Sequence, residues 1–315
     1  MQWVLFWFGV ALLVVLAARY WLLRKESKPR ASEAFDGVVY QVGAAAIVER
    51  HCEAPAATVI CMHGFVENLT YFTGFYDQPD VQLIAVNSCA YHLPIEKPHF
   101  VQAAWIDTPM APEGSIEYDA EVLNLALEHL PKSQRVRVHG HSRGGAVVLE
   151  AARQRPDLFH SVEVILEAPV LPQARPVSAI SPAAMWFMGF LVPLWRRKPI
   201  SRHNRGAWGP LDDERKRAFI EGLPFNSRRT DVMVANLRSM LLWMEQNDAE
   251  IFGCLTHGII IVPGKDRVLD VESMTESAQS AARYGVSIIE VDQCSHFVLL
   301  DRPDVFPAFS AKASA

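Results

Sequence analysis

The sequence predicts an α/β fold: a mostly parallel central sheet flanked by helices, with an inserted, mainly helical cap and a single N-terminal transmembrane helix. Three observations carry this prediction. Short apolar strands alternate with amphipathic helices through the first half of the chain, which is typical of parallel strands joined by helical crossovers. The alternation stops at residues 172–247, which are rich in proline, tryptophan, methionine and arginine, and two more strands follow. A long apolar run stands at the N-terminus.

Length and composition allow this architecture and exclude several classes of protein. The chain has 315 residues, half of them hydrophobic, which is enough to bury the core of one large domain or two smaller ones. A net charge of -5 gives no basic footprint for nucleic acid, so no nucleic-acid partner is predicted. The five cysteines are scattered without a C-x-x-C pair, which favours small buried side chains over a zinc site or disulfide framework. The oligomeric state has no signal in the sequence.

The N-terminal run, residues 3–23, is nearly all apolar and contains one charge, Arg19. It is long enough to cross a hydrocarbon layer of about 30 Å. We therefore predict an anchor at residues 1–24 in contact with the bilayer. A cleaved signal peptide is the alternative, but a basic patch follows the run and no basic side chain precedes it, which favours an uncleaved anchor.

The basic residues around the anchor predict its orientation. Only the α-amine precedes the span, and basic side chains, which favour the cytoplasmic side, follow it. We therefore expect a single-pass membrane protein with its body on the cytoplasmic side; a periplasmic or other extracytoplasmic location is the alternative. The basic residues that follow the start of the span are Arg19, Arg24, Lys25, Lys28 and Arg30.

The remaining segments follow in order. Residues 25–35 form a polar linker, and two parts of one core, residues 36–171 and 248–315, flank the cap at 172–247. Alternating patterns bounded by turn residues predict the strands, and Ser115 and Pro131 delimit the one long helix before the centre of the chain. The predicted elements are a hairpin at 37–52, strands at 58–62, 82–88, 162–170, 258–266 and 286–296, and a helix at 115–130.

The central feature is a serine between a strand and a helix. Ser142 lies in Gly140-His141-Ser142-Arg143-Gly144, with β-branched residues before it and a helix-forming apolar run after it. This is the G-x-S-x-G pattern of a nucleophile elbow, in which a strained turn exposes the serine hydroxyl. Glycine is expected on both sides because a side chain there would collide with the neighbouring strand and helix. An ordinary structural turn is the alternative.

Three further features complete a pattern in chain order. His63-Gly64-Phe65 follows the third strand, Asp266 follows a late strand, and His296 follows the last one. With Ser142, these residues give the chain a resemblance to the α/β-hydrolase family, and within it to membrane-anchored serine esterases and lipases. The resemblance covers residues 36–311 and implies the α/β-hydrolase fold. Family members place serine, acid and histidine in this order.

The resemblance assigns roles to individual residues. Ser142 is the nucleophile, His296 takes and returns its proton, and Asp266 orients the imidazole. Asp270 is the alternative acid, although an acid emerging directly from the strand favours Asp266. The oxyanion hole is formed by the backbone N–H groups of Phe65 and Arg143, so replacing either side chain need not abolish activity.

These roles imply hydrolysis of a carboxylic acyl ester through an acyl-enzyme, with a lipid or lysophospholipid as candidate substrate. An acyl thioesterase or acyltransferase with the same triad is the alternative, and a non-catalytic membrane protein that retains the fold is a further one. No cofactor and no metal are predicted, because His139 and His141 have no clustered carboxylate or cysteine partners.

An apolar stretch at residues 182–195 of the cap leaves two interpretations open. It is too short to cross a bilayer. It lines an acyl pocket above Ser142, or it lies in the membrane interface beside the basic residues that follow it. An ordinary cap helix packed on the core would have a similar composition.

Overall fold

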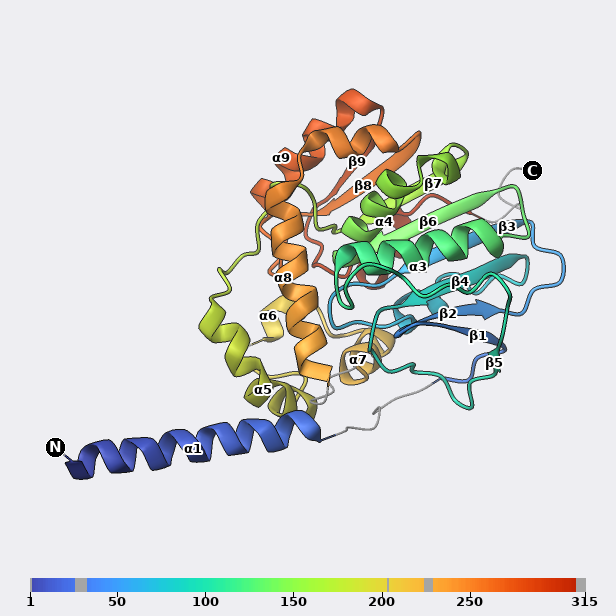
Figure 1. The fold of residues 1–315 in the computed structure, drawn as a ribbon. Helices are drawn as coiled ribbons and strands as arrows, with labels where there is room; N and C mark the ends of the chain where they lie inside the picture. The colour runs from blue at the N-terminus through green and yellow to red at the C-terminus, as the bar shows by residue number, and fades with distance from the viewer. Residues whose placement is uncertain (1, 26–32, 203, 224–228, 310–315) are drawn as a thin grey trace.

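The computed structural model describes residues 2–25, 33–202, 204–223 and 229–309. Residues 26–32 of the predicted linker lie outside this part of the chain. The described residues form a nine-stranded sheet in the order β5-β1-β2-β4-β3-β6-β7-β8-β9, with helices packed on it (Figure 1). The predicted α/β-hydrolase fold with a mostly parallel sheet is confirmed by this arrangement.

The sheet is parallel from β4 through β9 and antiparallel where β2 pairs with β1 and with β4. Every residue of β3 and β4 is buried, as expected for parallel strands covered on both faces. The short β5, which pairs with β1, has no pattern in the sequence, and β9 ends well before the predicted boundary. The strands are β1 Gly37–Val42, β2 Ala45–Arg50, β3 Ala57–Met62, β4 Val81–Asn87, β5 Phe100–Val101, β6 Val136–His141, β7 Val162–Glu167, β8 His257–Pro263 and β9 Ser287–Val291.

Helices α3 (Ile116–His129) and α4 (Arg143–Gln154) lie side by side across the middle of the sheet (Figure 1). The Ser115 hydroxyl accepts the N–H of Tyr118 at 3.0 Å and begins α3 as an N-cap, as the sequence predicts. The other helices outside the segment between β7 and β8 are α2 Thr70–Thr73, α9 Val271–Ala281 and α10 Val298–Asp301.

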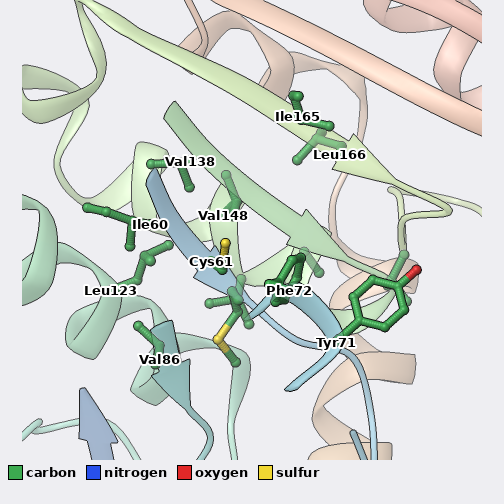
Figure 2. Packing of buried hydrophobic residues seen from close by; sticks show 14 of the residues in the cluster. Ile60, Cys61, Tyr71, Phe72, Val86, Leu123, Val138, Val148, Ile165 and Leu166 are labelled. Carbon is green, nitrogen blue, oxygen red and sulfur yellow. The ribbon is translucent and has the colours of Figure 1, made fainter. Parts of the chain in front are cut away.

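The core lies between these helices and the central strands. Ile60 and Val138 of the sheet pack with Leu123 of α3 and Val148 of α4, and all four side chains are fully buried (Figure 2). The apolar residues of α3 recur at helical spacing, and those of α4 form a nearly continuous run, so both helices have an apolar side to bury against the sheet.

Between β7 and β8 the chain leaves the sheet, and the residues described there include the α-helices α5 Pro182–Arg197, α6 Arg205–Trp208, α7 Glu214–Glu221 and α8 Thr230–Gln246. The Ser181 hydroxyl caps α5 by accepting the N–H of Ala184 at 3.1 Å. Helix α8 contacts α3, α4 and α5, so it connects the outer helix α5 to the core.

The N-terminal apolar run forms α1, Gln2–Arg24, which has no buried residue. By length and composition α1 fits either a membrane anchor or a signal sequence. Its C-terminal end contacts α5, and the rest of the helix extends away from the sheet and its covering helices (Figure 1).

Candidate active site

The candidate site lies at the carboxyl edge of the sheet, between β3 and β6. These neighbouring strands are the point at which the strand order changes direction, since β4 lies beyond β3 and β7 lies beyond β6. Ligands of open parallel sheets bind at such switch points. Phe65 and Ser142 follow β3 and β6, while Asp266 and His296 follow β8 and β9.

Ser142 occupies a backbone conformation that residues other than glycine rarely adopt, with φ of 52° and ψ of -120°. The surrounding structure holds it there. Its N–H donates to the Glu167 carbonyl at 2.9 Å, and its carbonyl accepts the N–H groups of Gly145 and Val170, both at 2.9 Å. A Cβ on Gly144 would collide with the Met62 carbonyl of β3, so the tight turn requires glycine.

His296 is hydrogen-bonded to Asp266. The distance from His296 Nδ1 to Asp266 Oδ2 is 2.6 Å, and the other carboxylate oxygen accepts the N–H groups of Val268 and Leu269 at 2.7 and 3.0 Å. Burial raises the pKa of Asp266, but His296 and these hydrogen bonds outweigh it and hold the pKa below its usual value. Nδ1 is thus occupied, and Nε2 of His296 has no hydrogen-bond partner among the residues that the structure describes.

Asp270 has a different environment. Its carboxylate accepts the Ser273 N–H at 3.0 Å and caps α9, and its side chain is 39% exposed. The structure therefore brings Asp266, and not Asp270, to His296.

Two cavities meet at Ser142. One, of about 270 Å³, is lined by both Ser142 and His296, and a second, of about 400 Å³, extends from Ser142 under the helices between β7 and β8. The two share Phe65, Trp195 and Val268, and their linings are largely apolar. The second cavity is lined further by Val170, Pro176, Val177, Ser178, Ile180, Ala184, Met188, Leu191, Leu237, Met240, Arg267 and Leu269.

The two backbone groups predicted for the oxyanion hole flank the serine. Arg143 is the first residue of α4, so its N–H has no partner within that helix. Within the part of the chain that the structure describes, the Phe65 N–H has no hydrogen-bond partner. Both groups are thus available to an oxygen bound beside Ser142.

A buried pair that no sequence pattern predicts, Glu67 and His141, lies beneath this site. Glu67 Oε2 accepts the N–H of Gly64 at 2.7 Å and lies 2.7 Å from His141 Nδ1. His141 Nε2 lies 3.0 Å from the His296 carbonyl oxygen. Burial lowers the pKa of His141, but Glu67 and Glu167 outweigh it and raise the pKa to about 9. A protonated His141 therefore connects the loop of Phe65 to the loop of His296.

A second buried pair joins β6 to β7. His139 Nε2 lies 3.1 Å from Glu167 Oε2, and the other oxygen of Glu167 accepts the Leu299 N–H at 2.7 Å and the Tyr71 hydroxyl. Burial lowers the pKa of His139, which is thus neutral near pH 7. The expectation that His139 and His141 have no clustered carboxylate partners is wrong, because Glu167 of β7 and Glu67 of the loop after β3 reach them in the folded chain.

The Arg143 side chain is also buried and structural. Its Nη1 donates to Asp119 Oδ2 at 2.6 Å and its Nη2 to the Ser115 carbonyl at 3.0 Å. Asp119 accepts further hydrogen bonds from the Ser88 hydroxyl and the Cys89 N–H. This pair fixes the first turn of α4 to α3, so replacing the Arg143 side chain would leave the buried Asp119 carboxylate without its charged partner.

One set of described side chains has the composition of a metal site. Ligand atoms of Glu67, His141 and His296 lie within 4.8 Å of one another. Hydrogen bonds already occupy both nitrogens of His141 and Nδ1 of His296. The groups present therefore match a hydrogen-bonded network better than a set of free ligands.

Comparison with known proteins agrees with this fold. Residues 111–308 match the model of the alpha/beta hydrolase family. None of the curated proteins compared matches the chain.

Among solved structures, a thermophilic esterase from Thermogutta terrifontis is similar at 15% identity and a TM-score of 0.55, over 89% of this chain and 94% of the other. The 2-hydroxy-6-oxo-6-phenylhexa-2,4-dienoate hydrolase of a Rhodococcus species gives 16% identity and 0.59, over 85% and 94%. A lipase-esterase related protein from Clostridium acetobutylicum gives 14% and 0.54, over 82% and 94%. At these identities the similarity concerns the fold.

Proposed function

Because the chain belongs to the alpha/beta hydrolase family, we propose that it is a membrane-anchored serine hydrolase that cleaves carboxylic acyl esters. The observation that carries this proposal is the 2.6 Å hydrogen bond between His296 and Asp266 at a cavity that His296 shares with the strained Ser142. An unassisted serine is a poor nucleophile near neutral pH, and this arrangement supplies the base and its orienting acid.

The proposed reaction begins when Ser142 Oγ attacks the ester carbonyl carbon while His296 Nε2 takes the hydroxyl proton. The negative charge on the carbonyl oxygen is stabilised by the N–H groups of Phe65 and Arg143 and by the N-terminus of α4. His296 then gives its proton to the leaving alcohol, and Ser142 is left acylated. Water attacks the acyl-enzyme by the same route and releases the acid.

The apolar cavities support an acyl ester of some size as substrate. Apolar side chains bind an acyl chain without leaving buried polar groups unpaired. The residues between the two parts of the core, 172–247, would act as the cap over this cavity, as predicted from the break in the strand pattern.

The location is part of the proposal. Helix α1, in residues 1–24, would remain as an uncleaved anchor, because the basic side chains that favour retention follow it directly. The same asymmetry favours the cytoplasmic side for the hydrolase body.

A fluorophosphonate probe tests the proposal, since an activated serine attacks its phosphorus, displaces fluoride and is left phosphonylated. We expect the detergent-solubilised full-length protein to be labelled and Ser142→Ala to remain unlabelled while keeping its circular dichroism spectrum. Absence of labelling in both proteins would refute the serine-hydrolase mechanism. Release of acid from an acyl ester, measured against an acyl thioester and against transfer to added alcohol, tests the reaction class.

A further inference from the structure

Helix α5 separates the larger cavity from the outer surface of the protein, and its two sides are both apolar. We propose that its outer side lies in an anionic lipid leaflet, so that the cap helix forms the wall between the bilayer and the acyl cavity and the substrate is an ester carried in that leaflet. This rests on the proposed function for the cavity and on the proposed anchor for the position of α1.

The inner side of α5 belongs to the cavity. Ala184, Met188, Leu191 and Trp195 line the 400 Å³ cavity that reaches Ser142. Their spacing of three and four residues places them in one stripe along the helix. This interpretation of the apolar stretch, as a pocket lining, is therefore consistent with the structure.

The outer side is an exposed patch of large apolar side chains. Phe187 is 51% exposed and Leu194 is 58% exposed, two turns apart on one face. Phe190 lies between them, with its ring 6.2 Å from that of Phe187 and 5.8 Å from that of Trp186. Contiguous exposed patches of this kind mark sites of interaction with other molecules or with membranes.

The contact between α1 and α5 indicates a lipid leaflet as the occupant. Arg19 Nε donates to the Trp186 carbonyl at 3.3 Å, and the Arg19 guanidinium lies 5.2 Å from the centre of the Trp186 ring. Gly189 of α5 lies against the same part of α1, since a Cβ built there would be in ordinary van der Waals contact with Arg19 and Leu23. These contacts fall in the last turns of α1, which an anchor places at the surface of the bilayer, and Figure 1 shows α5 beside that end.

Charge selects the kind of leaflet. Arg24 and Lys25 end α1, and Arg197 and Lys198 end α5, and all four side chains are exposed. Arg24 and Lys25 also lie over the rings of Tyr20 and Trp21, at 4.0 and 5.4 Å. Cations and aromatic rings at one level match the headgroup region, and cations beside an apolar helix favour anionic lipid.

The test compares substrates in full-length protein reconstituted in vesicles of phosphatidylcholine with phosphatidylglycerol. The variants are Phe187→Glu and Leu194→Glu, and the matched control is Met110→Glu, which replaces a 95% exposed side chain before α3. We expect hydrolysis of diacylglycerol in the vesicles to fall at least about tenfold in the two α5 variants and to stay near wild type in the control. Hydrolysis of water-soluble p-nitrophenyl butanoate should remain within about twofold in all three, because none of these residues lines either cavity at Ser142.

A second readout is independent of catalysis. In a Cys254→Ser background, Leu194→Cys and Met110→Cys carry an environment-sensitive dye, and brominated lipid in the vesicles quenches a dye that contacts acyl chains. We expect quenching at Leu194 and not at Met110, and stronger quenching with phosphatidylglycerol than with phosphatidylcholine alone.

The outcomes separate the two proposals. Equal quenching at both sites, or α5 variants that hydrolyse diacylglycerol like the control, would overturn the membrane position of α5. Quenching confined to Leu194 in a protein that fluorophosphonate does not label would support the membrane position and refute the enzyme. An equal degree of quenching at Leu194 with and without phosphatidylglycerol would overturn the preference for an anionic leaflet.

Discussion

The cavity floor and the cavity roof are built from different kinds of interaction. By the floor we mean the buried charged groups beneath Ser142, namely Glu67, His141, Asp119 and Arg143, each with hydrogen bonds of 2.6 to 3.2 Å. By the roof we mean the cavity-lining side chains of α5 and α8, which are apolar.

The difference has a functional meaning. A hydrogen-bonded charge pair out of contact with water has one favourable geometry, so the floor holds the serine turn, the oxyanion loop and the histidine loop in fixed positions. Apolar contacts have no preferred direction, so the roof can change shape or composition at a smaller energetic penalty. We therefore expect changes in the floor and its triad to remove activity or stability, and changes in the roof to alter substrate choice.

The largest effect is expected from replacing Asp266, the acid of the proposed triad. Asp266→Asn should lower kcat by about a thousandfold or more, because the amide favours the wrong tautomer of His296 and cannot stabilise its protonated form. Asp270→Asn, four residues on, serves as the matched control and should retain activity. Ester hydrolysis with a soluble substrate measures both, and equal loss in the two variants would contradict the assignment.

The second-largest effect is expected from removing Asp119, the carboxylate that pairs with Arg143. Asp119→Ala should lower the free energy of unfolding by about 3 to 5 kcal/mol, because Arg143 would stay buried without its partner. Urea denaturation of the detergent-solubilised protein measures the change. Asp157→Ala, which breaks an exposed pair with Arg155, should leave the unfolding midpoint unchanged. A small effect at Asp119 would show that the buried pair contributes no more than a surface one.

The raised pKa of His141 predicts a pH dependence of stability. The folded protein holds this proton up to about pH 9, whereas an unfolded histidine releases it near pH 6.5. The stabilisation is therefore complete below about pH 6.5 and is lost as the pH rises through about 9, in total about 3 kcal/mol.

Glu67→Gln isolates this contribution, because it removes one of the carboxylates that raise the pKa. Urea unfolding from about pH 6 to about pH 10 should show a smaller decline in the variant than in the wild type. Burial raises the pKa of thiols such as Cys61, so the stability of the protein also falls at high pH for this reason. This contribution is the same in the wild type and the variant, and it cancels when their pH profiles are subtracted. Parallel pH profiles would rule out a charged His141 as the source.

The smallest effect is expected in the roof. Leu191→Trp should fill part of the larger cavity and lower kcat/KM for a dodecanoate ester by about tenfold, with little change for a butanoate ester. Phe187→Trp, on the outer side of the same helix, is the matched control and should not alter the ratio. An equal loss on both esters would indicate that Leu191 affects the reacting groups and not the acyl chain.

Local patterns predicted much of the fold and the principal site residues. The strands around Ser142 are short apolar runs, and the elbow needs its glycines because of contacts within a few residues and with one neighbouring strand. The order of Ser142, Asp266 and His296 after successive strands is a signal of the same local kind, and its roles stay predictions that the experiments above test.

The floor could not be predicted, because its pairs come from distant positions. Glu67 and His141 are 74 residues apart, and Glu67 lies in a loop with no regular pattern. The two-residue β5 is too short to leave a period in the sequence. Helix α5 contains Pro193 in its interior, a residue that normally breaks a helix, so the sequence did not show that this segment is one continuous helix.

The proposed position of α5 beside α1 in the leaflet also determines which substrate concentration would control the rate of hydrolysis. A hydrolase whose cap helix lies in the leaflet meets its substrate by diffusion in two dimensions, so its rate follows the mole fraction of ester among the surrounding lipids. Diluting that ester with inert lipid would slow turnover even when the total amount in the sample is constant.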